Sequence, residues 1–214
     1  MSLIGNLGRN FFFLRHGFIA EEYRKVFYGQ FDVPLSEEGK IKSLKVVDEL
    51  SNYSIKAIFS SPLKRALFPA KALSERKNIP LIIKEELKEI NYGAWTGRPR
   101  EEIYKEPLFW ERLKNDTYFP PGGESIRDLR KRAKNFWDSL KDLEEGLYVI
   151  FTHGGFIKAL LCELLNLGSR FFLTFEVYHL RGVLITCLGE DQFFIRGVNL
   201  DIKDLGILLE SAYW

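Results

Sequence analysis

The chain of 214 residues is long enough for one large domain or two small ones, and an apolar fraction of 46% supports a substantial core. The 31 basic and 29 acidic residues leave a net charge of only +2, which argues against a nucleic-acid-binding protein that relies on bulk charge, so any bound anion must be held by a local cluster. No stretch reaches transmembrane length and the first residues lack the features of a signal peptide, so we expect a cytoplasmic protein with no membrane partner.

The first predicted element is a buried strand that ends in a charged pair. Residues 11–14 are four consecutive apolar residues, typical of a central strand buried on both faces. The strand delivers Arg15 and His16 at its carboxyl end, where open parallel sheets bind ligands, and Gly17 lets the backbone turn tightly there. A guanidinium beside an imidazole suits an anion next to a nucleophile or base, whereas a capped strand end with a solvated arginine is the alternative for this stretch alone.

The next predicted elements alternate between helix and strand. Helical spacing of apolar residues predicts an amphipathic helix over Glu37–Leu50, and Ile55–Phe59 is typical of a second buried strand. Pro62 is expected to open the following helix, which places Arg65 in a first turn where free N–H groups favour an anion. Pro69 lies in the same helix and is expected to kink or shorten it.

The middle of the chain predicts a short strand, a loop and a small cap. Leu81–Lys84 is typical of a third strand, and Glu85–Gly97 is typical of a loop. The charged and aromatic residues from 98 to 120 are expected to form short helices that make a small cap over one end of the sheet.

A long helix and a second strand ending in histidine follow the cap. Ser125 with Asp128 resembles a capping box, and the apolar stripe beyond it predicts a helix that ends near Gly146. Leu147–Thr152 is an apolar strand that ends in His153, again before glycine.

The last third of the chain predicts a buried helix and an edge hairpin. Phe156–Leu167 is apolar nearly all round, and the runs Val183–Leu188 and Phe193–Val198 are typical of an antiparallel hairpin. Cys162 and Cys187 lie in apolar runs without metal-site spacing, so we expect free buried thiols in a reducing compartment. With no repeat or linker, residues 1–214 are expected to form a single α/β domain.

Three separate strands therefore end in residues suited to the same chemistry, namely Arg15 with His16, Arg65, and His153. Two histidines and a carboxylate could hold a metal, but two arginines in the same crevice oppose a cation. An oxyanion such as phosphate fits better, because guanidinium groups bind it in bidentate fashion. A neutral imidazole can attack phosphorus, and Glu89 is the best-placed carboxylate to protonate a leaving alkoxide.

Five motifs, in register over about residues 11–167, together resemble the histidine phosphatase superfamily, also called phosphoglycerate mutase-like. They are Leu-Arg-His-Gly at 14–17, Ser-Ser-Pro-Leu-Lys-Arg-Ala at 60–66, Leu-Lys-Glu-Ile-Asn-Tyr-Gly-Ala-Trp-Thr-Gly at 87–97, Pro-Gly-Gly-Glu-Ser at 121–125 and Thr-His-Gly-Gly at 152–155. The short distance between the third and fourth motifs resembles the small phosphatase branch, with α-ribazole phosphatases and metal-independent phosphoserine phosphatases.

The resemblance implies a fold and a set of catalytic residues. The fold is a doubly wound, mostly parallel sheet with helices on both faces and an antiparallel edge near the C-terminus. His16 is implied as the phosphorylated nucleophile and Glu89 as the proton donor. Arg15, Arg65 and His153 are implied as the phosphate pocket, and neither a metal nor another cofactor is expected.

Further substrate contacts are expected around this centre. The resemblance assigns Tyr28, Gly29 and Tyr92 to the substrate loop, and Gly17 and Gly154 follow the two histidines. The chain also departs from the family pattern at four positions, which are Phe18, Ile19, Glu22 and Pro69. Glu22 stands where the family has an asparagine, so we place a carboxylate among the substrate-binding groups, where it would repel a phosphate.

We therefore expect a metal-independent phosphatase, a hydrolase that cleaves a small phosphorylated metabolite through a phosphohistidine. Two alternatives stay open. One is a catalytically weak binding or regulatory subunit, motivated by the four departures, and the other is a phosphoglycerate-type mutase that returns the phosphoryl group to its substrate.

Two other features carry no assigned role. His179 precedes the predicted hairpin and could reach the rim of the crevice, although a lone histidine is more often an ordinary surface or core residue. Tyr213 and Trp214 near the C-terminus leave open a homodimer, a heterodimer with a related chain, or packing onto the domain itself.

Overall fold

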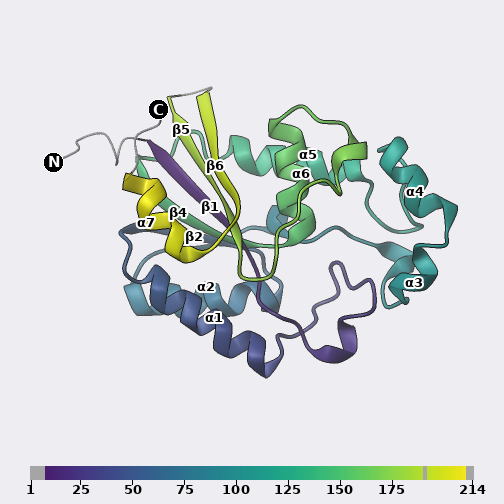
Figure 1. The fold of residues 1–214 in the computed structure, drawn as a ribbon, viewed down its shortest axis with the longest axis horizontal. Coiled ribbons are helices and arrows are strands. Elements are labelled where there is room, and N and C mark those ends of the chain that lie inside the picture. Colours follow the sequence, from purple (N-terminus) through teal and green to yellow (C-terminus); the bar gives the residue numbers. More distant parts are fainter. Residues whose placement is uncertain (1–7, 190–191, 211–214) are drawn as a thin grey trace.

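The computed structural model describes residues 8–189 and 192–210, and at its centre lies one six-stranded sheet in the order β3-β2-β4-β1-β5-β6 (Figure 1). One half of the sheet is parallel. β1 (Arg9–Arg15) pairs with β4 (Gly146–Thr152), β4 pairs with β2 (Ile55–Ser60), and β2 pairs with β3 (Leu81–Ile83) at the edge.

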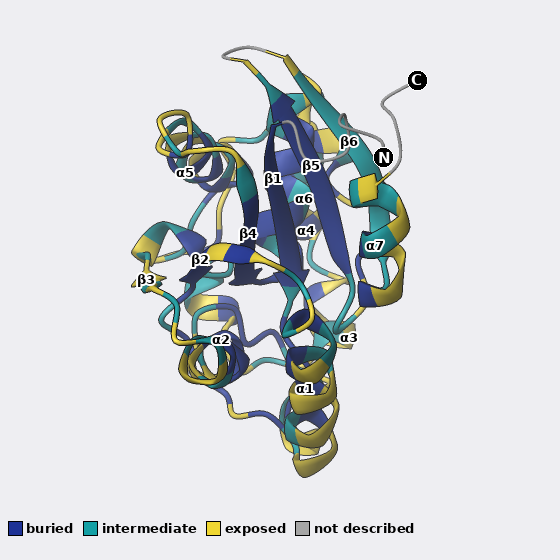
Figure 2. Cartoon of the chain, turned by 90° about the vertical axis from the view of Figure 1, so that its left-hand side faces the viewer, coloured by how far each residue is buried: buried dark blue, intermediate teal, exposed yellow. Residues whose placement is uncertain are grey.

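The other half of the sheet is antiparallel. β5 (Gly182–Leu188) runs against β1 on one side and against β6 (Gln192–Leu200) on the other. The predicted α/β fold, with a mostly parallel sheet and an antiparallel C-terminal pair, is confirmed. Figure 2 shows β1, β4 and β5 as buried strands in the middle and β6 as a less buried strand at the edge.

Side chains that alternate along β1 divide the core into two layers. Phe11 and Phe13 point to the face that is covered by α5 (Ile126–Asp138) and α6 (Gly154–Leu164). Both rings also contact Trp137 of α5 with their centroids 5.6 and 6.4 Å away.

The opposite layer is built on the intervening residues of the same strand. Phe12 and Leu14 pack against α1 (Glu37–Leu50), α2 (Lys64–Lys77) and α7 (Ile202–Glu210). Helices therefore cover both faces of the sheet, and residues 11–14 of β1 are fully buried because they are apolar on both sides.

The carboxyl ends of the three central parallel strands meet at one edge of the sheet. Arg15 pairs with Thr152, and Ser60 pairs with Phe151, so these three strands stop almost level with one another. The residues that follow each strand therefore begin side by side, which positions the site described below.

Short helices lie beyond this edge. They are α3 (Arg100–Ile103) and α4 (Pro107–Lys114), at the right of Figure 1, and they are the helices expected between residues 98 and 120. An aromatic cluster of Phe27, Trp95 and Phe109 packs with Ile103 to hold them. Single helical turns complete the connections at Glu21–Tyr23, Glu85–Leu87, Gly93–Trp95 and Ser169–Phe171.

The long helix α5 begins as predicted and ends early. Ser125 and Asp128 form a reciprocal capping box. The helix ends at Asp138, well before the glycine that was expected to end it, because the hydroxyl of Ser139 donates to the carbonyl of Phe136 and closes the last turn.

Two other helices differ from their predicted bounds. α2 begins at Lys64 instead of Pro62, because the carboxylate of Asp32 accepts the N–H of Lys64 at 2.7 Å. The helix continues through Pro69, so the predicted shortening does not occur. α6 spans Gly154–Leu164 rather than 156–167, which makes the preceding residue its N-cap.

Cys162 and Cys187 are free and buried, as predicted. In residues 8–189 and 192–210, no helix is both long and apolar enough to cross a membrane. The predictions about Tyr213 and Trp214 concern residues outside the described ranges.

Candidate active site

His16 follows β1 and is buried with one nitrogen anchored and the other free of partners. Its Nδ1 lies 2.8 Å from the carbonyl oxygen of Gly17, and a carbonyl can only accept, so Nδ1 carries the proton. Nε2 then holds the lone pair and has no hydrogen-bond partner. Burial first, and then the nearby Arg65, His153 and Arg15, hold the pKa of His16 well below its usual value, so the ring is neutral.

Gly17 positions this ring because it packs tightly against α1. A Cβ added to Gly17 would lie 2.5 Å from Oγ of Ser43 and 3.0 Å from the carbonyl oxygen of Gly39. A side chain would therefore push the turn away from α1 and move the carbonyl that orients His16.

His153 follows β4 as the N-cap of α6, and its ring centroid lies 5.2 Å from that of His16. Its Nε2 is 2.8 Å from Oγ of Ser61, which also accepts the N–H of Leu63. The Ser61 hydroxyl can thus donate to Nε2, which leaves the proton of the neutral ring on Nδ1. Burial, Arg65 and Arg15 hold the pKa of His153 well below its usual value.

The two arginines are held by main-chain carbonyls. Arg65, in the first turn of α2, is fully buried and donates to the carbonyls of Gly29 at 2.6 Å and Phe31 at 3.0 Å. Arg15 donates to the carbonyl of Val177 at 2.7 Å and to Nε2 of His179 at 3.1 Å. Because these carbonyls belong to loops, Arg15 ties a loop to the end of β1 and Arg65 ties another loop to the start of α2.

Four buried nitrogen atoms around this point lack a hydrogen-bond partner: Nε of Arg15, Nε2 of His16, Nε of Arg65 and Nδ1 of His153. Buried polar atoms without partners are rare in folded proteins and need an explanation. Three of these atoms can donate N–H groups, and one offers a lone pair. That set suits an anion bound beside a nucleophile.

Glu89 stands next to these residues, at the N-terminus of α6. Its Oε2 accepts the N–H of Gly155 at 3.1 Å, and its Oε1 accepts the N–H of Ile90 at 2.9 Å. A Cβ on Gly155 would overlap Oε1 of the carboxylate. A glycine at this position is therefore what allows Glu89 to reach the site.

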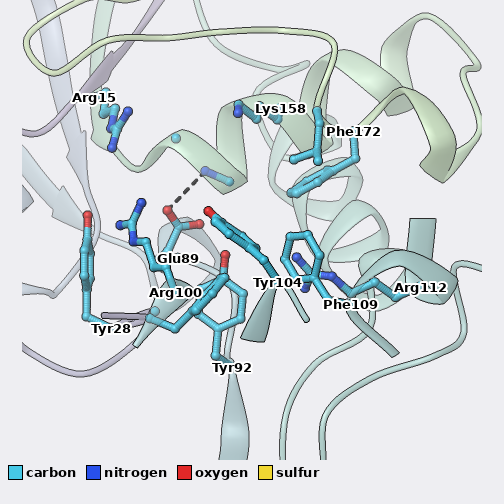
Figure 3. Close-up of a pocket in the computed structure, with 15 residues that line it drawn as sticks. Arg15, Tyr28, Glu89, Tyr92, Arg100, Tyr104, Phe109, Arg112, Lys158 and Phe172 are labelled. Carbon is cyan, nitrogen blue, oxygen red and sulfur yellow. Dashed lines mark hydrogen bonds between the residues drawn. The ribbon is translucent and has the colours of Figure 1, made fainter. Parts of the chain in front are cut away.

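A cavity of about 210 Å³ extends from these residues to the short helices (Figure 3). It is smaller than the roughly 300–1,000 Å³ of pockets that hold drug-sized ligands, so its occupant is small. Its polar and aromatic lining includes Arg15, Tyr28, Gly29, Glu89, Tyr92, Arg100, Tyr104, Phe109, Arg112, Gly154, Lys158 and Phe172. His16, Arg65 and His153 are buried and are not among the residues that line it.

The predicted substrate contacts divide into two groups. Tyr28, Gly29, Tyr92 and Gly154 line the cavity together with Arg15 and Glu89. Glu22 is exposed on a single helical turn and is not among the lining residues, so its contact with substrate stays a prediction.

His179 reaches the centre, although the sequence left its role open. Its ring centroid lies 5.3 Å from that of His16 and 5.1 Å from that of Phe18. Burial, and then Arg15, lower the pKa of His179 to about 3, so the neutral ring accepts a hydrogen bond from Arg15. The sequence did contain a signal for this position. His179 comes just before β5, and β5 begins beside the end of β1, where His16 lies.

Comparisons with known proteins agree with this arrangement. The model of the histidine phosphatase superfamily (branch 1) matches residues 11–201. Phosphoserine phosphatase 1 of Hydrogenobacter thermophilus is 31% identical over 154 residues, which are 70% of this chain and 72% of that protein. A probable phosphoglycerate mutase of Yersinia pestis, GpmB, is 29% identical over 163 residues, 74% of this chain and 76% of that protein. The solved structure of a mycobacterial glucosyl-3-phosphoglycerate phosphatase has the same fold, with a TM-score of 0.81, 24% identity, and coverage of 91% of this chain and 100% of that one.

Proposed function

Because the chain belongs to the histidine phosphatase superfamily, we propose that it hydrolyses a small phosphomonoester through a phosphohistidine at His16. The observation that carries this proposal is the unpartnered lone pair on Nε2 of a neutral, buried His16, surrounded by N–H donors that also lack partners. The small-metabolite phosphatases among its relatives support a phosphatase.

Binding comes from the three unpartnered donors. Nε of Arg15, Nε of Arg65 and Nδ1 of His153 donate to the phosphoryl oxygens and offset their charge in a dry site. Because the loop carbonyls already hold both guanidinium groups, little reorganisation is needed when the charge moves during transfer.

The reaction then has two steps. In the first, Nε2 of His16 forms a bond to phosphorus, the bond from phosphorus to the leaving oxygen breaks, and that oxygen takes a proton from Glu89. In the second, Glu89 takes a proton from water as the water attacks phosphorus, and the N–P bond breaks to restore His16. The N–H on Nδ1 stays on the carbonyl of Gly17 throughout and stabilises the positive phosphorylated ring.

We also propose a cytoplasmic location, which the free buried thiols of Cys162 and Cys187 support. A homodimer stays a prediction that sedimentation measurements can test.

The proposal is tested with the purified chain in EDTA, using p-nitrophenyl phosphate and a panel of metabolite phosphates. Vanadate should inhibit competitively, because its five-coordinate form resembles the transferring phosphoryl group. His16→Gln should lower kcat by about 10⁴-fold or more, as loss of a nucleophile does, and should abolish an acid-labile, base-stable phosphate label. Lys45→Gln, an exposed change on α1, is the control.

Two results would contradict the proposal. One is substantial activity in His16→Gln, and the other is activity that requires added Mg²⁺ or Zn²⁺. A wild-type chain that binds vanadate but hydrolyses nothing on the panel would instead support the non-catalytic subunit.

A further inference from the structure

Arg132 of α5 joins that helix to the Glu89 segment, which comprises residues 86–91. Nη1 of Arg132 donates to the carbonyls of Glu86 at 2.5 Å and Lys88 at 2.7 Å, and Nη2 donates to the carbonyl of Glu89 at 3.3 Å. Nε and Nη2 also donate to the carboxylate of Glu124, at 2.9 and 2.8 Å. A guanidinium has five N–H donors in a fixed planar fork, so these five bonds use all of them.

Glu124 holds the Glu89 segment on the other side of Glu89. Its N–H donates to the carbonyl of Asn91 at 2.8 Å, and its Oε2 accepts the N–H of Asn91 at 3.2 Å. The side chains of Glu124 and Arg132 are only 14% and 19% exposed, so water competes little for these bonds. Glu124 belongs to the motif at 121–125, which contributed to the family resemblance without an assigned role. One ion pair thus binds the main chain both before and after Glu89.

The Glu89 segment needs such support because it has little regular structure of its own. Residues 88–92 belong to no helix or strand, so bonds to other parts of the chain must fix their main-chain groups. The N–H groups of Ile90 and Gly155 orient the carboxylate of Glu89, and Figure 3 shows the bond from Gly155 as a dashed line. Proton transfer requires oxygen atoms about 2.6–3.2 Å apart, so a small shift of the segment would move the carboxylate out of range.

We propose that Arg132 and Glu124 form a clamp that positions Glu89 to protonate the leaving oxygen, which makes Arg132 a positioning residue for the reaction. The inference rests on the proposed function, because it concerns the proton donor of that reaction. Loosening the clamp should slow the step that needs a proton. Phosphate binding should stay intact, because other main-chain carbonyls hold the two arginines of the phosphate site.

Arg132→Lys tests the clamp with little risk to folding. A lysine keeps the positive charge beside Glu124, but its single nitrogen cannot reproduce the planar fork that spans the three carbonyls. For benzyl phosphate, whose leaving alkoxide needs a proton, kcat/KM should fall by about 10–10²-fold, as expected for a displaced catalytic group. For p-nitrophenyl phosphate, whose leaving group needs no proton, kcat/KM and the inhibition constant of vanadate should each change by less than about threefold.

Arg130→Lys is the matched control on the same helix. Arg130 is 15% exposed and pairs with Glu163 at 2.9 Å, and Arg130→Lys should leave kcat/KM unchanged for both substrates. Glu124→Gln is a second variant of the clamp, because it removes the charge and keeps an oxygen that can accept from Asn91. It should show the same dependence on the leaving group, and it replaces Arg132→Lys should that variant fail to fold.

A double variant separates positioning from general damage to the fold. In Glu89→Gln the proton donor is already absent, so adding Arg132→Lys should lower kcat/KM for benzyl phosphate by less than about twofold further. Independent damage to the fold would instead multiply the two losses, because effects on separate features add as free energies.

Amide hydrogen exchange provides a readout that does not depend on turnover. Arg132→Lys should speed exchange of the N–H groups of Ile90 and Gly155, which donate to Glu89, by at least about tenfold, and Arg130→Lys should not. Unchanged exchange, equal losses for both substrates, or multiplied losses in the double variant would overturn the clamp and leave the phosphatase intact. Faster exchange in a chain that hydrolyses neither substrate would support the clamp and overturn the phosphatase.

Discussion

The two ends of the cavity are built in different ways. At the strand-tip end, Arg15 ends β1 and His153 follows β4, two paired strands whose register aligns them, and His16 is anchored by the carbonyl of the next residue. At the cap end, Arg112 lies on an eight-residue helix with no side-chain N-cap bond, held by an aromatic cluster. Short uncapped helices depend on tertiary packing for their stability. The residues proposed for phosphoryl transfer therefore lie on the more constrained part of the fold.

This difference has a consequence for recognition. Side chains that take part in phosphoryl transfer must be positioned to within a fraction of an ångström, and paired strands can provide that precision. A group that selects the rest of the substrate can lie on a segment that varies without disturbing the sheet. Substitutions at the strand tips should therefore lower the turnover of every substrate, whereas substitutions in the cap should affect some substrates more than others.

The largest effect expected from a single added methyl group is at Gly155. In Gly155→Ala the new Cβ overlaps Oε1 of Glu89 and displaces the carboxylate. The kcat/KM for alkyl phosphates, which reports phosphoryl transfer to His16, should fall by about 10²–10⁴-fold, the range for loss of a general acid. The loss should be much smaller for p-nitrophenyl phosphate, whose leaving group needs no proton, and steady-state kinetics on both substrates measures the difference.

Two variants control this prediction. Glu89→Gln should reproduce the same substrate dependence, because it removes the proton that Gly155→Ala displaces. Gly168→Ala adds a methyl group with no atom within 4 Å and should leave activity unchanged. Equal losses for both substrates in Gly155→Ala would mean that the methyl group disturbs the phosphate site instead.

A smaller effect is expected at His179, which positions Arg15. His179→Leu removes one of the two acceptors that hold the guanidinium, so kcat/KM should fall and the inhibition constant of vanadate should rise, each by about tenfold. His179→Gln should restore most of the loss, because the amide oxygen can accept from Arg15. The pH profile between 6 and 9 should not change, since the pKa of His179 is about 3. Failure of glutamine to rescue would show that packing against Phe18 matters more.

Stability should depend on pH through the strand-tip end and not through the cap. The pKa values of His16, His153 and His179 are lowered in the folded chain, whereas in the unfolded chain they lie near about 6.5. Below that pH the unfolded chain binds more protons, so the free energy of unfolding falls as the pH drops, by up to about 1.4 kcal/mol per pH unit for each histidine. Urea midpoints at pH 7.5 and 5.0 measure this slope.

One variant from each end of the cavity tests whether these histidines cause the pH dependence of stability. His179→Gln should reduce the slope by about a third, since it removes one of three such groups. Arg112→Met should leave the slope unchanged, because its side chain does not titrate in this range. A slope that is the same in wild type and in His179→Gln would contradict the lowered pKa of this histidine.

The strand-tip end could be predicted from the sequence because its signals are local. An apolar run such as residues 11–14 predicts a strand, and the parallel arrangement brings the ends of such strands together, so Arg15, His16 and His153 could be grouped from the sequence alone. The bounds of α1 were predictable for the same reason, since Ser36 and the apolar spacing lie within one segment.

The cap end could not be predicted because its contacts are distant in sequence. Arg112 packs against Tyr92, Trp95 and Phe109, and no periodic pattern in the sequence predicts that these residues are in contact. The start of α2 was misplaced for a related reason, because its capping group is Asp32, more than thirty residues earlier. Local patterns describe elements, whereas these features depend on how elements pack.

The smallest effect is expected at Glu22, which lies outside the cavity lining. Its carboxylate is exposed on a single turn outside the cavity lining, and solvent and salt screen an exposed charge over distances beyond about 8 Å at physiological ionic strength. Glu22→Asn should therefore change kcat and KM by less than about twofold for p-nitrophenyl phosphate and for phosphoserine at that ionic strength. A larger fall in KM for both substrates would mean that the segment from 18 to 28 moves over the substrate and brings the carboxylate close to the phosphate. A rise in KM for phosphoserine alone would place Glu22 against the amino group of the substrate. Either result would make the loop after His16 a third determinant of selectivity beside the strand tips and the cap.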